Sequence, residues 1–223
     1  MMPQRISKKI LIYLLIFFSL VTINNTKLSN DFFKIKQLNI IGLDTLETAK
    51  IYDDLIIFKN DNIFLFNKEN FSKKIYSNKF VDRFKIFKIY PSTLNIEIKK
   101  TKFLAITKNN NSDYFIGNNG KLIKKGNTNF NLPYIFGNVN VQNFLEFKLI
   151  IDKSNFKFNE IENLYHFQSN RWDMETQSGL LIKLPSNLTI QKLNLIYEII
   201  NNDEFNKNKI LDFRQNNMIV INE

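Results

Sequence analysis

The stretch Phe84–Ile98, FKIFKIYPSTLNIEI, decides the fold of the first part of the chain. On both sides of Pro91, apolar residues alternate with polar ones, which is typical of strands that bury one face. Pro91 fixes φ and has no backbone donor, so Tyr90-Pro91-Ser92 suits a tight turn. The stretch therefore predicts an antiparallel pair of strands, whose buried residues are Phe84, Ile86, Leu94, Ile96 and Ile98.

Two helical patterns and a further strand precede this hairpin. Apolar residues recur at helical spacing over 46–58, and again over 67–78, where Asn67 can cap the helix. Before them, 33–41 is a strand candidate that changes its phase of alternation near Lys36 and ends at Gly42, where a turn needs freedom in φ. The order predicts a β-α-α-β-β domain over 32–100, with both helices on one face of a three-stranded sheet.

After Lys100 the chain changes to short alternating segments. Asn119-Gly120 and Ser178-Gly179 have the composition of tight turns between strands. Two helices interrupt the strands, and a last strand lies just before the C-terminus. We therefore predict an α+β fold in which 101–223 is a mostly antiparallel β domain with two helices and an edge strand at its end. The strands are 103–107, 114–116, 122–123, 170–175, 180–184 and 218–221, and the helices 141–151 and 189–200.

The first thirty residues have the order of an export signal. Arg5, Lys8 and Lys9 precede one unbroken apolar run, 10–23, and a polar stretch follows it. The run has 14 residues, and as a helix it reaches about 21 Å against a hydrocarbon core of about 30 Å. Its exit lacks the small residues that cleavage needs, so we favour an uncleaved transmembrane anchor over a cleaved signal. The predicted organisation is a cytoplasmic tail 1–9, an anchor 10–23, a linker 24–31 and the two domains.

Composition excludes several classes of protein. The chain of 223 residues has no cysteine, which rules out disulfides and thiolate metal sites. Its net charge is +10, but the basic residues are scattered singly and form no stripe interleaved with aromatic residues. We therefore expect no nucleic-acid partner. Attraction to an anionic membrane surface is the more useful consequence of this charge.

Several segments together resemble one family. Tyr90–Ile98 resembles the aromatic-Pro-x-x-Leu-x-Ile hairpin, with Leu94 at its apolar position, that closes the POTRA domain of the FtsQ/DivIB cell-division proteins. Later segments follow in the order of that family. The chain departs from the family pattern at the domain junction, where Lys100 and Phe103 replace a Glu and a Pro. The later segments are Ile116–Ile123 with Gly120, Leu132–Gly137, Trp172 with Gly179 and Leu184, and Leu211–Arg214.

The resemblance implies a scaffold without chemistry. Proteins of this family are single-pass anchors in the bacterial inner membrane at the division septum, with a cytoplasmic N-terminus and a periplasmic C-terminus. They bind the single-pass proteins FtsB and FtsL, among other components of the division complex (the divisome), and help to control septal peptidoglycan synthesis. The family's partner surface is the edge of the last strand, where a segment of FtsB adds as a further strand. In this chain that edge falls on Met218, Ile219, Val220 and Ile221.

Four further residues near that edge have both a functional and a structural interpretation. Asp212 and Arg214, two apart on a predicted strand, can orient the last hairpin toward the partner, or they can form an ion pair within the domain. Trp172 is interpreted as a packing anchor, and Arg171 beside it as a further residue of the partner surface. For the four residues of the last strand, the alternative is that they are simply core.

Catalytic and metal-binding patterns are missing from the sequence. The one histidine, His166, has no Ser or Cys motif around it. The carboxylate pairs Asp53-Asp54 and Asp173 with Glu175 lie in no apolar pocket pattern. No phosphate-binding loop or metal spacing occurs. We therefore expect no catalytic residue, cofactor, metal or small-molecule substrate.

Two other functions stay open on the sequence. POTRA modules also occur in chaperone and secretion proteins of the outer membrane, which carry several modules and a barrel. A secreted hydrolase that modifies the cell wall is the other alternative, and the missing catalytic set disfavours it.

Overall fold

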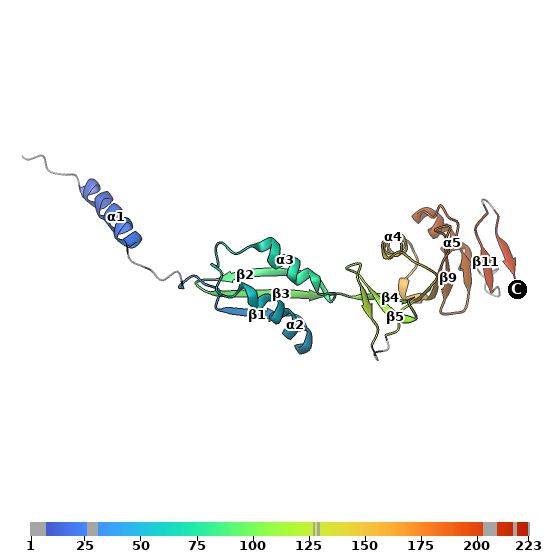
Figure 1. Ribbon diagram of the computed structural model, residues 1–223. Helices are drawn as coiled ribbons and strands as arrows, with labels where there is room; N and C mark the ends of the chain where they lie inside the picture. Colours follow the sequence, from blue (N-terminus) through green and yellow to red (C-terminus); the bar gives the residue numbers. More distant parts are fainter. Residues whose placement is uncertain are drawn as a thin grey trace, which may run out of the picture. The chain divides into compact units, whose positions relative to one another are not determined.

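The computed structural model describes residues 8–25, 31–126, 128, 130–202, 209–215 and 218–222 (Figure 1). The described chain has the predicted α+β composition of helices and strands. It divides into two compact units, of which the first contains Met1–Asn78 and Phe84–Lys99 and the second Lys79–Arg83 and Lys100–Glu223.

The N-terminal helix α1 covers Lys8–Asn25. Its large apolar side chains from Ile10 to Val21 are all exposed. Within the ranges that the structure describes, no helix combines the length and the apolar character needed to cross a membrane. The predicted span 10–23 is therefore not confirmed.

The first unit has the predicted β-α-α-β-β order. Its sheet has the strand order β1-β3-β2, and β1 pairs with β3 in parallel. The buried side chains of Leu94, Ile96 and Ile98 share one face of β3, which the helices cover. Asn67 caps α3, because its side-chain oxygen accepts from the backbone N–H of Asn70 at 3.0 Å. The elements are β1 (Gln37–Ile41), α2 (Thr45–Leu55), the 3-10 helix η1 (Ile56–Phe58), α3 (Lys68–Ser77), β2 (Val81–Ile89) and β3 (Thr93–Lys100).

The turn at Tyr90-Pro91-Ser92 is confirmed, but the first strand is shorter than predicted. β1 begins at Gln37, and the residues before it follow another path. Lys34 forms an isolated bridge with Asn62, and the N–H of Ile35 donates to the carbonyl of Asp61 at 2.9 Å. The change of alternation near Lys36 marks the point where the chain enters the sheet as β1.

The second unit is a mixed sheet with the strand order β12-β11-β10-β9-β8-β7-β4-β5-β6. Five of its strand pairs are antiparallel and three are parallel. The elements are β4 (Phe103–Asn109), β5 (Ser112–Gly117), β6 (Leu122–Lys124), β7 (Tyr134–Phe136), α4 (Val141–Asp152), the 3-10 helix η2 (Phe158–Glu160), β8 (Ile161–His166), β9 (Trp172–Thr176), β10 (Leu181–Lys183), α5 (Ile190–Ile200), β11 (Ile210–Asp212) and β12 (Val220–Asn222).

Both predicted helices and both predicted turns of this unit are present. Gly120 and Gly179 have φ of 75° and 84° in the turns β5-β6 and β9-β10. Strands β7 and β8 were not predicted, and β11 ends at Asp212, so that Arg214 lies just beyond it. The helix α4 connects β7 to β8 and the helix α5 connects β10 to β11, and both strand pairs are parallel. Each helix is thus a crossover between parallel neighbours.

The core of this unit lies between one face of the sheet and both helices (Figure 1). Phe144 and Ile151 of α4 and Leu193 of α5 are fully buried there. Because both helices cover the same face, the opposite face of β8 to β12 stays open. That arrangement places β12 at an edge with one covered face and one open face.

Candidate functional site

β12 ends the nine-stranded sheet, as the sequence predicts for the last strand. It pairs with β11 on one side, and no strand of the described chain pairs with its other side. The strand starts at Val220, two residues later than predicted. The exposed fractions of Met218, Val220 and Ile221 are 59%, 47% and 44%. Such an apolar edge presents unpaired backbone groups to any chain that can add a strand.

Strand register assigns the residues of this edge to two faces. Ile221 aligns with the buried Leu211, on the face that the helices cover, and Val220 aligns with Asp212 on the open face. Ile219 is partly buried and packs against the core. By register, Ile221 lies on the helix side and Val220 on the open side, and both are nearly half exposed, whereas Ile219 packs against the core.

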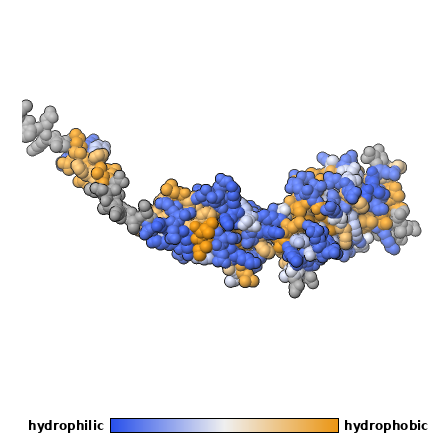
Figure 2. Space-filling view, in the orientation of Figure 1, coloured by the Kyte–Doolittle hydropathy of each residue, from blue (hydrophilic) through white to orange (hydrophobic). Residues whose placement is uncertain are grey.

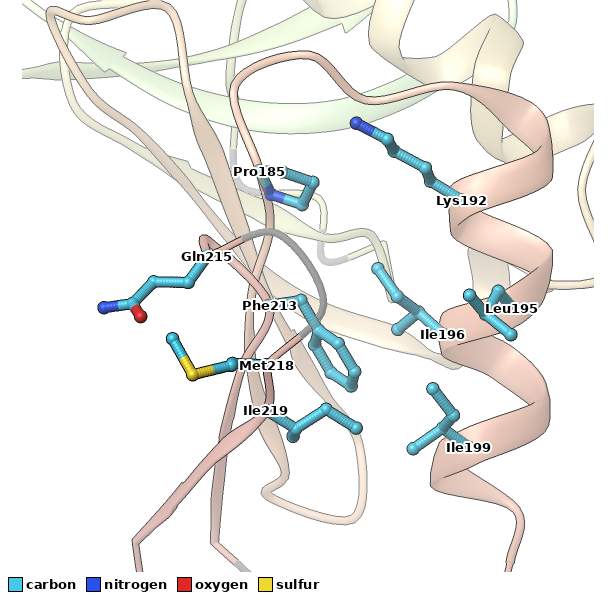
Figure 3. A pocket seen from close by; sticks show the side chains of 9 residues that line it. All are labelled: Pro185, Lys192, Leu195, Ile196, Ile199, Phe213, Gln215, Met218 and Ile219. Atoms are coloured by element: carbon cyan, nitrogen blue, oxygen red, sulfur yellow. The ribbon is translucent and has the colours of Figure 1, made fainter.

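An apolar groove of about 310 Å³ lies beside this edge, between α5 and the segment that leads into β12 (Figure 3). Figure 3 shows Leu195, Ile196 and Ile199 on the helix side and Phe213 and Ile219 on the other side. Leu195 has an exposed fraction of 56%. The lining residues are Pro185, Lys192, Leu195, Ile196, Ile199, Phe213, Gln215, Met218 and Ile219.

A charged cluster occupies the open face beside the edge. Asp173, Lys183 and Asp212 align across β9, β10 and β11, in the same row as Val220. The carboxylate of Asp173 is 3% exposed and accepts from Nε of Arg171 and from the N–H of Leu184, both at 3.3 Å. Burial raises the pKa of Asp173, and the charge of Arg171 opposes this shift.

Asp212 and Arg214 form an ion pair within the domain. Nε of Arg214 donates to both carboxylate oxygens of Asp212, at 2.8 and 2.9 Å, and the backbone N–H of Arg214 donates to the same carboxylate at 3.0 Å. The hydrogen bond from Arg214 lowers the pKa of Asp212. The structural interpretation of the pair is therefore correct, and a role in orienting a partner stays a prediction.

This ion pair predicts a pH dependence of stability. The folded-state pKa of Asp212 is lowered, so its contribution is present above the unfolded pKa of about 3.9 and is lost as the pH falls through the lower folded value. We expect Asp212→Asn to unfold at a lower temperature than the wild type at pH 7, with a difference that shrinks below about pH 4. Thermal unfolding followed by fluorescence of the single tryptophan measures both. A difference in unfolding temperature that persists unchanged at low pH would contradict the role of this ion pair. The double variant Asp212→Asn with Arg214→Gln should lose little more stability than Asp212→Asn alone.

Trp172 is a packing anchor, as predicted. Its exposed fraction is 6%, and its ring stacks on Phe147 with centroids 4.6 Å apart. The ring of His166 lies 4.6 Å from Trp172, and its nitrogens contact the carbonyl of Asn138 at 3.0 Å and Oδ1 of Asn170 at 3.2 Å. These contacts explain the lone histidine as part of the β8-β9 turn.

The two carboxylate pairs of the sequence, Asp53 with Asp54 and Asp173 with Glu175, lie in different units of the structure. Asp53 and Asp54 belong to α2 of the first unit. Glu175 accepts from the hydroxyl of Tyr165 at 2.8 Å and from the side-chain amide of Asn163 at 3.0 Å. Burial and this hydrogen bond raise the pKa of Tyr165 to about 12. Among the residues that the structure describes, no three His, Cys, Asp or Glu gather in a way that can hold a metal ion.

Two features of the site were not predicted, the groove and the grouping of Arg171 and Arg214 around Asp173. Arg171 and Arg214 both act on the charge of Asp173, although they lie 43 residues apart in the numbering. The sequence pattern that the two arginines share is the alternation of charged residues on β9 and after β11. This pattern indicates a charge cluster only when the strand order is known.

Comparison with known proteins gives two family matches. Residues 33–100 match the model of a family described as "POTRA domain, FtsQ-type". Residues 105–214 match that of "Cell division protein FtsQ/DivIB, C-terminal". The two matches adjoin and cover most of the chain. β12 and the residues just before it lie beyond the second match.

Three relatives are similar over parts of their length. The chain is 26% identical to the cell division protein FtsQ of Rickettsia bellii over 195 residues, which cover 85% of this chain and 72% of that protein. It is 29% identical to the cell division protein DivIB of Clostridium botulinum (strain Hall) over 122 residues, 55% of this chain and 46% of the relative. With DivIB of Staphylococcus aureus (strain NCTC 8325) it shares 30% identity over 94 residues, 42% of this chain and 21% of the relative. The chain thus aligns with less than half of either DivIB protein.

Proposed function

We propose a function for this chain from its family, because it belongs to the FtsQ/DivIB cell-division proteins. In this proposal the protein is a non-catalytic scaffold of the bacterial division complex, and it captures a partner along the free edge of β12. The observation that carries this proposal is the position of β12, which ends the sheet with exposed apolar side chains. An added strand would pair its backbone with β12 and so cover them.

The proposed occupant is a segment of an FtsB-like single-pass division protein, which an FtsL-like protein accompanies. Main-chain hydrogen bonds to β12 supply affinity that is independent of side chains. Selectivity comes from the two sides of the edge: the groove beside Leu195 accepts an apolar side chain, and the cluster around Arg171 and Arg214 favours an acidic one. Through this partner the protein helps to control septal peptidoglycan synthesis.

Membrane attachment through α1 is part of the proposal. Lys8 and Lys9 precede its apolar residues, and those side chains are exposed to solvent unless a lipid phase covers them. The protein is then a septal inner-membrane protein with a cytoplasmic N-terminus and a periplasmic C-terminus. Alkaline extraction of membranes tests the attachment, and release of the protein into the soluble fraction would contradict it.

Deletion of residues 218–223 is the simplest test of the binding edge. We expect the shortened protein to stay in the membrane fraction but to lose co-purification of the FtsB-like partner. Unchanged co-purification would contradict the proposal. Depletion of the whole protein is expected to give filamentous cells without constrictions, whereas normal septa with low levels of outer-membrane proteins would indicate a transport function instead.

The groove gives a prediction with a matched control. Leu195→Asp places a charge where the partner's apolar side chain binds, and we expect the Kd to rise at least about tenfold, which corresponds to about 1.4 kcal/mol. Leu149 of α4 has nearly the same exposed fraction, 53% against 56%, but does not line the groove. Leu149→Asp should therefore bind normally. Equal binding by both variants would exclude the groove from the interface.

A further inference from the structure

One end of the first unit is built from three segments, 31–36, 59–68 and 88–92. The N–H of Ile63 donates to the carbonyl of Phe33 at 2.8 Å, and the N–H of Lys36 donates to the carbonyl of Ser92 at 2.8 Å. These hydrogen bonds join the start of the unit to a loop and to the β2-β3 turn. The three segments therefore form one continuous surface, which we call the entry end.

Aromatic rings form a connected series on the entry end. Centroid distances are 5.0 Å for Phe32 and Phe33, 5.2 Å for Phe33 and Phe64, and 4.8 Å for the stacked rings of Phe64 and Tyr90. The exposed fractions of Phe64, Tyr90 and the adjacent Leu65 are 51%, 54% and 83%. Figure 2 shows small apolar patches on the first unit between broad hydrophilic areas. A continuous apolar surface of this kind marks a site of interaction.

Lysines outnumber acidic residues on the three segments of the entry end. Asp31 and Asp61 are the acidic residues of the three segments, and Asp31 pairs with Lys34 at 2.5 Å. Lys88 lies 4.9 Å from the ring of Phe66, and burial together with the charge of Lys68 lowers its pKa. Cations that crowd in this way gain from an anionic ligand. The lysines of the three segments are Lys34, Lys36, Lys59, Lys68 and Lys88.

The chain connects α1 directly to the entry end. α1 ends at Asn25 and the entry end begins at Asp31, six Cα steps later. A fully extended chain of that length spans about 20 Å at most. If α1 is held in a membrane, the entry end cannot move farther than this from the end of α1.

We propose that the entry end docks on an anionic bilayer surface, with Phe64, Leu65 and Tyr90 in the interfacial layer and the lysines on lipid phosphates. Aromatic side chains favour this layer, and each lysine near an anionic surface adds to the attraction. The docking rests on the proposed membrane attachment of α1. Docking holds the first unit at the membrane surface. It therefore limits the distances from the membrane at which the rest of the chain can bind a partner.

The absence of cysteine from the sequence allows a direct test. A single nitroxide label is placed on Leu65→Cys in the full chain, reconstituted into vesicles of phosphatidylglycerol and phosphatidylethanolamine. Collision rates with oxygen and with a water-soluble nickel chelate report the depth of the label. The matched control is Leu46→Cys, because Leu46 is 79% exposed and lies at the start of α2, beyond the opposite end of β1.

We expect the ratio of oxygen to nickel collisions at Leu65 to rise severalfold on reconstitution, while the ratio at Leu46 stays near its value in water. Lys36→Glu with Lys68→Glu, or vesicles of phosphatidylcholine, should reverse most of the rise at Leu65. A label at Leu65 as accessible to nickel as that at Leu46, in protein that floats with the vesicles, would overturn the docking and leave the surface for a protein partner. Protein that fails to float would instead contradict the attachment of α1.

Discussion

Whichever of Val220→Pro and Ile219→Pro removes the N–H at the free edge is expected to weaken capture of the FtsB-like partner strongly. Successive N–H groups of a strand point to opposite sides, so one of these two residues directs its N–H at the free edge. Proline removes that donor and leaves a carbonyl of the added strand without a partner. Losing the bond and burying the unpaired carbonyl costs about 1 to 3 kcal/mol, which weakens binding roughly five- to 150-fold.

Two controls separate loss of the edge from loss of the fold. Val220→Thr keeps the N–H and the branched shape of the side chain, so it should bind within a fewfold of the wild type. Thermal unfolding should be nearly unchanged in Val220→Thr and in the proline variant whose N–H faces the free edge, whereas the other proline variant removes an N–H on the β11 side and should unfold earlier. Trp172 fluorescence follows this transition, because Trp172 is buried in the same unit. Binding is measured by pull-down from membranes and by titration. Undiminished capture by both proline variants would remove strand addition as the mechanism.

Gly42→Ala is expected to destabilise the first unit strongly. Gly42 has φ of +102°, and a Cβ built on it would lie 1.9 Å from the carbonyl oxygen of Ile98. Alanine rarely adopts this backbone conformation, and its Cβ would clash with β3. We therefore expect a loss of about 2 to 4 kcal/mol in the free energy of unfolding. The cause is the close approach of the chain after β1 to the end of β3.

The single tryptophan makes this prediction specific to one unit. Circular dichroism follows both units, whereas fluorescence of Trp172 follows the second alone. Gly42→Ala should lower the first unfolding transition seen by circular dichroism and leave the fluorescence transition in place. Gly126→Ala is the control, because a Cβ there meets nothing within 4 Å. A shift of the fluorescence transition alone, or equal effects of both variants, would contradict the account.

The parts of the fold that the sequence predicted well are those with local signals. The alternation before and after Pro91 specifies β2 and β3, and Asn119-Gly120 specifies the turn β5-β6. The helices α4 and α5 have apolar stripes of sufficient length. The last strand was predicted over 218–221 and is found over Val220–Asn222. In each case the pattern is complete within about fifteen residues.

The parts that could not be predicted depend on distant residues. β7 has three residues, too few for a period, and it is held by a parallel neighbour across a helix. The sequence predicts a strand over residues 33–36, but Phe33 and Ile35 form backbone hydrogen bonds with the loop at 60–63, and Lys36 with Ser92. The groove beside Leu195 exists only because β12 returns to the side of α5.

Hydrogen exchange at β12 tests the central claim most directly. The amides of 218–222 are followed in the membrane-reconstituted protein, with and without the periplasmic segment of the FtsB-like partner. If the partner adds a strand, protection should increase by at least about tenfold at the outward-facing amides of this segment and little at the other sheet edge, β6. Exchange at 218–222 that stays unchanged while the partner is bound would contradict strand addition at β12.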